Sequence, residues 1–369
     1  MASDPAPDEL SAAQLRAILQ QFLAGQPLYQ RQQLQLQRSL SSLWPTLPSS
    51  SSSGSSLVDR LQQLQELYPP LNAFCQDRLG WPCPLDLLWR LWLPLAQQIL
   101  DWRQVQQSFV LEPLMLGIVG LQGTGKTTLT LILAKILRSW GWRVAQLSID
   151  DLYKTYAERQ QLQQLDPRFC WRGPPGTHDL ELGLSVLQNL RQLQPTALPR
   201  FDKSAQQGAG DRGQPEWVGE LDLLLFEGWF VGLRPIDPAC FETAPPPIQT
   251  TADRDFAREV NRRLANYLPL WAQLDRLVLI YPTDCQPDRQ LDYRLSQRWR
   301  RQAEQQRIAT GQPGMPAAEV DAFVKYFWRA LHPALFLPPL LASGRLDLAI
   351  QVSPDRVPIQ ISYPASNPD

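Results

Sequence analysis

The stretch from Leu114 to Thr128, LMLGIVGLQGTGKTT, constrains the fold of this chain more than any other. A short apolar run, typical of a buried strand, leads into a loop with glycines at 120, 123 and 125, and a helical pattern follows. Such a loop turns backbone N–H groups inward around phosphate oxygens, and the helix behind it directs the positive end of its dipole at them. The order of strand, loop and helix favours a phosphate-binding loop over a glycine-rich turn that matches by chance.

Within this loop, the residue types indicate separate tasks. Lys126 is expected to reach the β- and γ-phosphates of a nucleotide and to take part in catalysis, and the Thr127 hydroxyl is expected to ligate Mg²⁺. The predicted nucleotide-binding residues are Gly120, Gln122, Gly123, Thr124, Gly125, Lys126, Thr127 and Thr128.

Length and composition limit what surrounds the loop. A chain of 369 residues suggests one large α/β domain with an accessory part. With 35 basic and 36 acidic residues, the net charge of −1 gives no reason to expect nucleic acid or a membrane as a partner. The five cysteines form no C-x-x-C pair, so neither zinc nor a disulfide framework is indicated and a reducing cytoplasm fits best. The acidic start, MASDPAPDELSAAQ, is typical of neither a secretory signal nor a transit peptide.

Residues 1 to 110 are predicted to form a helical accessory region, and residues 111 to 369 the phosphate-loop domain. Apolar residues recur at helical spacing around residues 15 to 23, and leucines do so again around residues 57 to 67. Between them, the serine-rich tract at residues 41 to 56 can bury no face, so we expect a linker or a long surface loop.

Two further strands are predicted to bring carboxylates to the edge of the sheet where the loop lies. One ends at Asp150 and Asp151, and the apolar strand within LDLLLFEGW ends at Glu227. Ligands of open parallel sheets bind at this edge, so we expect Asp150 to act in catalysis and Asp151 to contact a substrate. Glu227 is expected to organise Mg²⁺ together with Thr127. The alternatives are that the Asp pair caps a helix and that a buried strand happens to stop at a glutamate.

Two loop-like segments and one helix supply cations. RGPPGTHDLELG at residues 172 to 183 and PRFDKSAQQGAGDR at residues 199 to 212 concentrate charge over a rigid sheet, as substrate loops do. A basic helix from Asp292 to Thr310 places three arginines on one face, which could form a surface stripe or a lid over a phosphoryl group. The predicted lid covers residues 291 to 310. The candidates are Arg172, His178, Asp179, Lys203 and Arg212 for the substrate, Arg294 and Arg298 for catalysis, and Arg301 for the nucleotide.

Strands continue to alternate with helices toward the end of the chain. A helix is expected from about Asp253 to Trp271, a strand at Leu277 to Tyr281, a helix pair over residues 317 to 341 and a last strand near Leu346 to Val352. This alternation predicts a mainly parallel sheet with right-handed crossovers, in a three-layer α/β/α fold of the P-loop NTPase type.

The ordered set GLQGTGKTT, SIDDLY, HD, PRFDKS, LLLFEGW and RLSQRWRRQAE resembles the superfamily of phosphoribulokinase, uridine kinase and pantothenate kinase. More narrowly, RGPPGTHDLELG, PRFDKSAQQGAGDR and FEGWFVGLRP are similar to the D-glycerate 3-kinases of plants and cyanobacteria. The resemblance covers about residues 110 to 352. It implies Asp150 as the catalytic base, Asp179 as a ligand of a substrate hydroxyl, and Arg294, Arg298 and Arg301 as lid arginines.

The resemblance further implies a kinase that uses ATP and Mg²⁺ to convert D-glycerate to 3-phosphoglycerate, in the recovery of photorespiratory glycerate. Arg172, His178, Lys203 and Arg212 are the candidates to hold the glycerate carboxylate. Because uridine kinases carry an aromatic residue at the position of His178, a nucleoside acceptor is less expected. Pantothenate or a nucleoside remains the alternative among kinases, and an ATP-binding protein without catalysis is the alternative of another class. The oligomeric state is open, with a monomer favoured.

Overall fold

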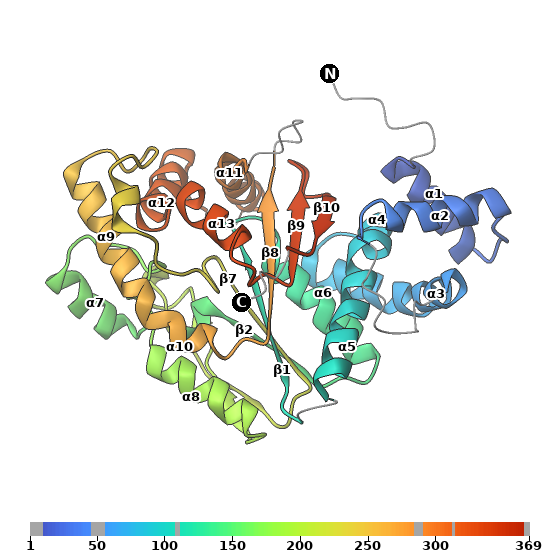
Figure 1. Ribbon diagram of the computed structural model, residues 1–369, viewed down its shortest axis with the longest axis horizontal. Coiled ribbons are helices and arrows are strands. Elements are labelled where there is room, and N and C mark those ends of the chain that lie inside the picture. The colour runs from blue at the N-terminus through green and yellow to red at the C-terminus, as the bar shows by residue number, and fades with distance from the viewer. Residues whose placement is uncertain (1–9, 46–55, 108–110, 284–290, 312–313, 365–369) are drawn as a thin grey trace.

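A computed structural model describes residues 10–45, 56–107, 111–283, 291–311 and 314–364. Its centre is a six-stranded sheet with the strand order β10-β9-β8-β1-β7-β2 (Figure 1). The strands are β1 (Leu114–Gly120), β2 (Val144–Ser148), β7 (Leu223–Gly228), β8 (Arg276–Pro282), β9 (Leu348–Val352) and β10 (Pro358–Ser362). Neighbours are parallel except β10, which pairs antiparallel with β9 at the edge. The predicted parallel sheet is confirmed, and β10 is a strand that the sequence pattern did not indicate.

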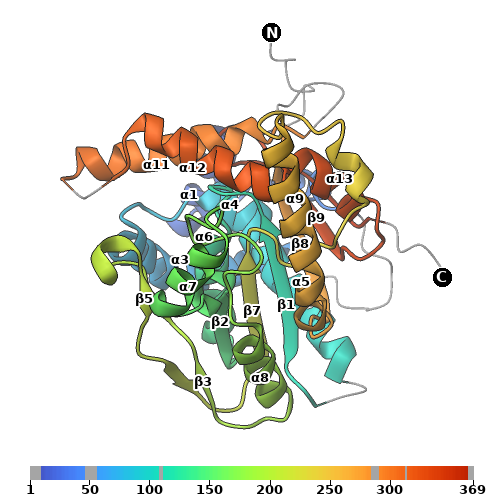
Figure 2. The ribbon, with the colours of Figure 1, turned by 90° about the vertical axis from the view of Figure 1, so that its left-hand side faces the viewer.

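Alternating side chains of β1 divide the core into two halves. Leu114, Leu116 and Ile118 pack in one hydrophobic cluster, whereas Met115 and Val119 pack in the cluster on the opposite face. Helices cover both faces, as is usual for parallel sheets, and the predicted three-layer α/β/α architecture is confirmed (Figures 1 and 2). One face carries α5 (Leu93–Gln107) and α6 (Lys126–Ser139), and the other carries α8 (Leu180–Arg191), α9 (Thr251–Leu264), α10 (Leu268–Trp271), α12 (Ala317–Ala330) and α13 (Pro333–Leu341).

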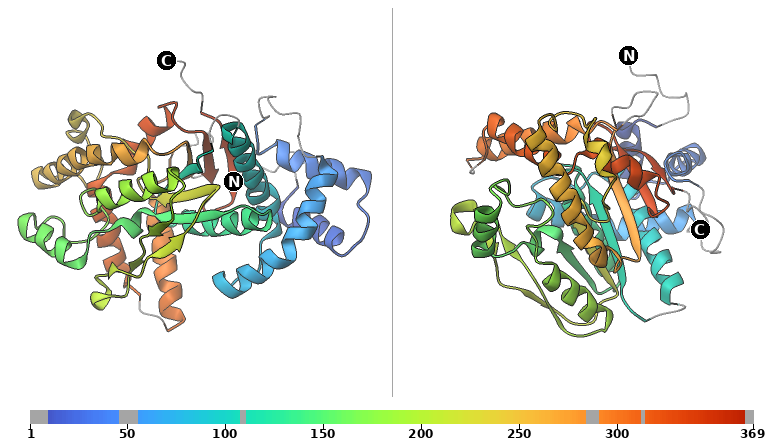
Figure 3. Two further views of the ribbon diagram at one scale, coloured as in Figure 1. Left: turned by 90° about the horizontal axis from the view of Figure 1, so that it is seen from below. Right: turned by 60° about the vertical axis from the view of Figure 1, so that its left-hand side comes forward.

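The N-terminal region is helical, as predicted, and shares a core with the rest of the chain. It contains α1 (Ala12–Leu23), α2 (Gln30–Ser41), α3 (Leu57–Phe74) and α4 (Leu85–Leu87), which Figure 3 shows at one end of the molecule. Leu15, Leu19 and Leu36 belong to the same cluster as Leu133 of α6. Helix α2 was not predicted, because its glutamine-rich sequence carries few apolar residues.

Parts of the predicted domain division fall on residues that the structure does not describe. Helix α2 ends at Ser41, where the predicted serine-rich linker begins, but residues 46–55 of that linker lie outside the described residues. The predicted boundary at residue 110 likewise falls on residues 108–110, and the acidic start of the chain on residues 1–9. In the described part of the chain, the longest apolar helical stretches fall short of what a bilayer crossing needs.

Between β2 and β7 the chain forms an arm that carries the predicted substrate loops. The arm contains α7 (Tyr156–Leu165), α8 and two small antiparallel pairs, β3 (Thr196–Leu198) with β6 (Glu216–Val218) and β4 (Phe201–Asp202) with β5 (Asp211–Arg212). Farther along the chain, the predicted basic helix is present as α11 (Arg294–Ala309), and it packs against α12 (Figure 2).

Candidate active site

The loop between β1 and α6 has a backbone that requires glycine. Gly123 and Gly125 have φ values of +78° and +89°, which residues with a side chain rarely adopt. A Cβ on Gly120 would lie 2.6 Å from the carbonyl oxygen of Ile280, so β1 approaches β8 too closely there for a side chain. Helix α6 begins at Lys126, directly behind these glycines. Glycine conformation and helix N-terminus together form a cradle suited to phosphate oxygens.

Charged and polar side chains complete the base of this cradle. The Lys126 ammonium is buried and donates to the Leu121 carbonyl oxygen at 3.0 Å. Burial lowers the pKa of Lys126, and the carboxylates of Glu227 and Asp150 partly offset this effect. The Thr127 hydroxyl donates to Glu227 Oε1 at 3.0 Å. The end of β7 and the start of α6 therefore present two neighbouring oxygen ligands, the type that Mg²⁺ prefers.

Asp150 follows β2 directly, in the short 3-10 helix Ile149–Leu152. Its Oδ1 accepts a hydrogen bond from the Tyr153 hydroxyl at 2.8 Å, and its Oδ2 accepts one from Lys203 Nζ at 2.8 Å. Burial acts to raise the pKa of Asp150, but the Lys203 ammonium and the two hydrogen bonds outweigh burial and hold the pKa below its ordinary value. The carboxylate is therefore ionised at neutral pH and can accept a proton.

Asp151 has different surroundings from its neighbour. Its carboxylate accepts hydrogen bonds from the backbone N–H of Ser148 at 3.0 Å and of Phe201 at 3.2 Å, and from Arg200 at 3.2 Å. These bonds cap the short helix and attach the arm to the end of β2. The two neighbouring aspartates therefore have different roles. Asp151 completes the capping box of the short helix with Ser148, and Asp150 is the candidate base.

His178 is part of an aromatic stack that supports Tyr153. The two rings lie 4.6 Å apart at an angle of 23°, and His178 Nδ1 lies 2.7 Å from the Tyr267 hydroxyl. The side chain is only 2% exposed, and burial lowers its pKa to about 3. A buried imidazole that is neutral at physiological pH cannot attract a carboxylate as a cation would, so the structure gives His178 the surroundings of a supporting residue.

Asp179 and Arg212, both predicted substrate residues, form an ion pair with each other. Asp179 is also the N-cap of α8, where its Oδ1 accepts from the Leu182 N–H at 3.0 Å. Burial acts to raise the pKa of Asp179, but these donors hold it below its ordinary value. Arg212 also donates to the Tyr153 carbonyl oxygen at 3.4 Å. The Asp179–Arg212 ion pair therefore lies beside Tyr153, whose hydroxyl donates to Asp150.

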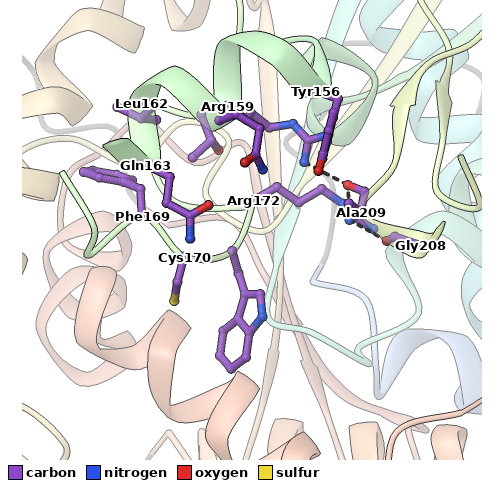
Figure 4. Close-up of a pocket in the computed structure, with 12 residues that line it drawn as sticks. Tyr156, Arg159, Leu162, Gln163, Phe169, Cys170, Arg172, Gly208 and Ala209 are labelled. Atoms are coloured by element: carbon purple, nitrogen blue, oxygen red, sulfur yellow. Dashed lines mark hydrogen bonds between the residues drawn. The ribbon is translucent and has the colours of Figure 1, made fainter. Parts of the chain in front are cut away.

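Arg172 ties together two segments of the arm around a pocket of about 330 Å³ (Figure 4). Its guanidinium donates to the carbonyl oxygens of Gly208 at 3.1 Å and Ala209 at 2.7 Å. Arg159 also donates to Ala209, at 2.8 Å, and both guanidinium groups lie 5.3 Å from the centre of the Phe201 ring. The Arg172 side chain therefore holds the predicted substrate loop at residues 199 to 212 in place by binding its backbone carbonyl groups.

The three predicted lid arginines have two kinds of surroundings. Arg294 and Arg298 are exposed on α11. Arg301 is paired with Asp321 of α12, and its Nε donates to that carboxylate at 2.6 Å. The structure therefore presents Arg301 to the neighbouring helix, and the proposed contact between this residue and a nucleotide stays a prediction.

A different arginine of α11, Arg300, lies beside the phosphate loop. A Cβ on Gly123 would lie 2.8 Å from Trp299 Cβ and 3.8 Å from the backbone nitrogen of Arg300. Burial lowers the pKa of Arg300, against the raising effect of Glu304 at 2.7 Å and a weaker one from Asp150. The backbone of Arg300 thus lies beside the loop, whereas its guanidinium pairs with Glu304 of the same helix and lies 5.4 Å from the centre of the Phe323 ring.

At one edge of the sheet, these residues assemble the parts of a phosphoryl-transfer site. The glycine cradle and Lys126 suit a chain of phosphates, and Thr127 and Glu227 supply oxygen ligands for a metal ion. The ionised Asp150 lies at the end of β2, which is separated from β1 by β7. Tyr153 was missed as a site residue, although it lies in the SIDDLY motif three positions after Asp150 and so on the same side of a helical turn.

Several known proteins are similar to the chain in sequence or in fold. No protein-family model matches. The chain is 33% identical over 265 residues to the protein named D-glycerate 3-kinase, chloroplastic, of Arabidopsis thaliana, covering 67% of this chain and 54% of that protein. It thus spans about half the length of that relative. It is 31% identical over 243 residues to the uncharacterized kinase mug58 of Schizosaccharomyces pombe, covering 63% of this chain and 85% of that protein. A solved structure of a D-glycerate 3-kinase from Cryptococcus neoformans var. grubii matches with a TM-score of 0.65 and 27% identity, over 73% of this chain and 98% of that one.

Proposed function

Because the chain belongs to the D-glycerate 3-kinase family of P-loop kinases, we propose that it transfers the γ-phosphoryl group of ATP to the 3-hydroxyl of D-glycerate. The observation that carries this proposal is the geometry around Asp150. An ionised carboxylate, fixed by Tyr153 and Lys203 at 2.8 Å each, stands at the edge of the sheet that also holds the phosphate cradle. A protein that only binds ATP would not need a base held in this way.

In the proposed reaction, Asp150 accepts the proton of the acceptor hydroxyl while the hydroxyl oxygen forms its bond to the γ-phosphorus. The bond from that phosphorus to the bridging oxygen breaks, and ADP leaves. Lys126 stabilises the charge on the β- and γ-phosphate oxygens, and the exposed arginines Arg294 and Arg298 of α11 would add positive charge as the lid closes. The glycine loop orients the phosphates through its backbone N–H groups.

Mg²⁺ fits the oxygen pair at the base of the cradle. We propose that the Thr127 hydroxyl and the Glu227 carboxylate, 3.0 Å apart, would hold the ion. When bound, Mg²⁺ would supply positive charge to offset that of the phosphates. Glu227 also keeps the Thr127 hydroxyl oriented, and its negative charge favours the ammonium form of Lys126.

The proposed reaction needs a cation close to Asp150 to hold the glycerate carboxylate. His178 is neutral, Arg172 is bonded to backbone carbonyls and Arg212 is paired with Asp179. Lys203 is also paired with a carboxylate, but that carboxylate is the candidate base itself, and the Lys203 side chain is 64% exposed. We therefore assign the acceptor carboxylate to Lys203, whose flexible stem can turn from Asp150 toward the bound acid.

A coupled assay of ADP release tests the proposal directly. The purified chain is incubated with ATP, Mg²⁺ and D-glycerate, L-glycerate, pantothenate or uridine in turn, and the product is identified by phosphorus NMR. We expect ADP release that depends on D-glycerate and a product phosphorylated at carbon 3. Release that ignores the acceptor would overturn the kinase assignment, and preference for pantothenate or uridine would overturn the glycerate assignment alone.

The cellular setting is a separate proposal. A role in recovering photorespiratory glycerate follows from the reaction if the organism forms glycerate in that way. The cytoplasmic location expected from the cysteines stays a prediction, and the Arabidopsis relative bears the word chloroplastic in its name.

A further inference from the structure

The turn between β9 and β10 contains a residue in a backbone conformation that its side chain disfavours. Arg356 has a φ of +61°, in the left-handed region that favours glycine. Ser353 holds the turn closed, since its N–H donates to Val357 O at 2.8 Å and its carbonyl accepts from the Arg356 N–H at 2.9 Å. A residue with a long side chain persists in such a conformation only where the surrounding structure holds it there.

The side chain of Arg356 reaches the phosphate loop from 233 positions away in the sequence. Its Nε donates to the carbonyl oxygen of Gly123 at 2.8 Å. Its guanidinium also lies over the ring of Trp299, 5.0 Å from the ring centre, and Trp299 Nε1 donates to Pro354 O at 2.7 Å. Loop, α11 and the β9–β10 turn are thus joined at one point, and Arg356 remains exposed there.

The sheet order indicates which part of ATP would lie at this point. Asp150 and Glu227 follow β2 and β7, which lie on one side of β1, whereas β8 and β9 lie on the other side. The transferred phosphoryl group must face Asp150, so the nucleoside end of ATP extends toward the β8 and β9 side. The β9–β10 turn is at the carboxyl end of β9, where ligands of open parallel sheets bind.

We propose that Arg356 is a positioning residue for the nucleotide: it fixes the Gly123 peptide of the phosphate loop and closes the nucleoside side of the site. This inference rests on the proposed function for the direction in which ATP lies. Gly123 has a φ of +78° and no side chain of its own, so the bond from Arg356 adds a fixed contact to a part of the loop that no side chain of Gly123 can anchor. A loop held in its binding conformation loses less entropy when phosphate binds.

Arg356→Gly separates this role from a structural one. Glycine relieves the strain at φ +61° while it removes the guanidinium, so the two effects on stability oppose each other. We expect a melting temperature within about 3 °C of wild type. Calorimetric titration with ADP and Mg²⁺ should show a dissociation constant raised about tenfold, as for the loss of one charge-assisted bond that orders the loop. The KM for ATP should rise with it, and the KM for glycerate should not change.

Two further variants complete the test. Leu193→Gly is the matched control, since Leu193 also has a positive φ, of +57°, in a turn after α8, and it should leave the ADP affinity unchanged. Arg356→Lys keeps the positive charge but loses the planar guanidinium. Of the affinity for ADP that Arg356→Gly loses, it should recover about a third or less on a logarithmic scale. ADP binding is measured well below the melting temperature of every variant, so that a variant with lower stability is still folded during the titration.

Unchanged ADP affinity in Arg356→Gly would overturn the inference and leave Arg356 as a turn residue. An equal rise in the KM for glycerate would overturn the assignment to the nucleotide side. Failure of the proposed function gives a different result, because wild-type protein that binds ADP but ignores glycerate still allows the ADP titration of each variant.

Discussion

Replacing Tyr153 by phenylalanine should move the acid limb of the pH–rate profile to higher pH. The variant removes one of the two side-chain donors to Asp150 and retains the ring that stacks on His178. A hydrogen bond to a charged group contributes about 1.5–3 kcal/mol, and one pKa unit corresponds to about 1.4 kcal/mol. Loss of the Tyr153 hydroxyl should therefore raise the pKa of Asp150, which the native donors hold low. Activity is lost as the pH falls through this pKa, so the loss begins at higher pH in the variant.

The assay is kcat/KM for glycerate as a function of pH at saturating ATP and Mg²⁺. Well above the acid limb, the Tyr153→Phe variant should approach the wild-type rate, since Asp150 is ionised in both proteins. Lys203→Met is the comparison: it removes both a donor to Asp150 and the positive charge beside it, so it should move the acid limb in the same direction at least as far while raising the KM for glycerate. An acid limb that does not move in Tyr153→Phe would refute the account of Asp150 as the titrating base, and a uniform loss at all pH values would assign Tyr153 a purely structural role.

Three other measurements follow from the structure. Asp150→Asn should lower turnover by about 10²–10⁴ with ATP affinity within a few-fold, and near wild-type turnover would exclude general-base catalysis. Lys126→Ala should weaken both nucleotide binding and turnover, because it removes the buried charge at the cradle; unchanged values would exclude the loop from the mechanism. Both histidines, His178 and His332, are buried, and burial lowers their pKa values to about 3 and about 4. Below the unfolded pKa of about 6.5, the unfolded chain binds protons at these histidines that the folded chain does not bind. The free energy of unfolding should therefore fall on acidification, by up to about 2 kcal/mol for each histidine at about pH 5. A melting temperature independent of pH over that interval would contradict this.

The sequence predicted the sheet and the cradle because both depend on local patterns. Apolar runs of strand length and glycines at fixed spacing are properties of neighbouring residues, so the strand ending at Gly120 and the helix starting at Lys126 lie where expected. The pair of Thr127 with Glu227 was also predicted, since the carboxyl ends of parallel strands meet at one edge. Helix α2 and strand β10 were missed, the first because of its polar composition and the second because it follows a turn with no glycine.

Side-chain partners could not be predicted in the same way. Arg172, His178 and Arg212 have the charges or polarity of substrate ligands, yet Arg172 and Arg212 find partners within the arm and His178 finds one at Tyr267, just before α10. That choice depends on which backbone carbonyls and carboxylates the folded loops bring near, and a sequence pattern does not contain this information. Arg300 is a further case, since its backbone lies beside Gly123 while its guanidinium pairs with Glu304.

The N-terminal region supports the phosphate loop from behind, and this support is divided unequally among its helices. Helices α3 and α5 pack directly against α6, and Lys135 of α6 lies 5.9 Å from the centre of the Phe74 ring. Helix α1 instead packs on α4, where Arg16 pairs with Asp86 at 3.0 Å. Because α6 carries Lys126 at its first turn, displacement of α3 or α5 would move the cradle, whereas loss of α1 and α2 would expose apolar surface two layers away from it. We infer that the division between supporting and dispensable helices lies between α2 and α3, within the N-terminal region, and not at its end near residue 110.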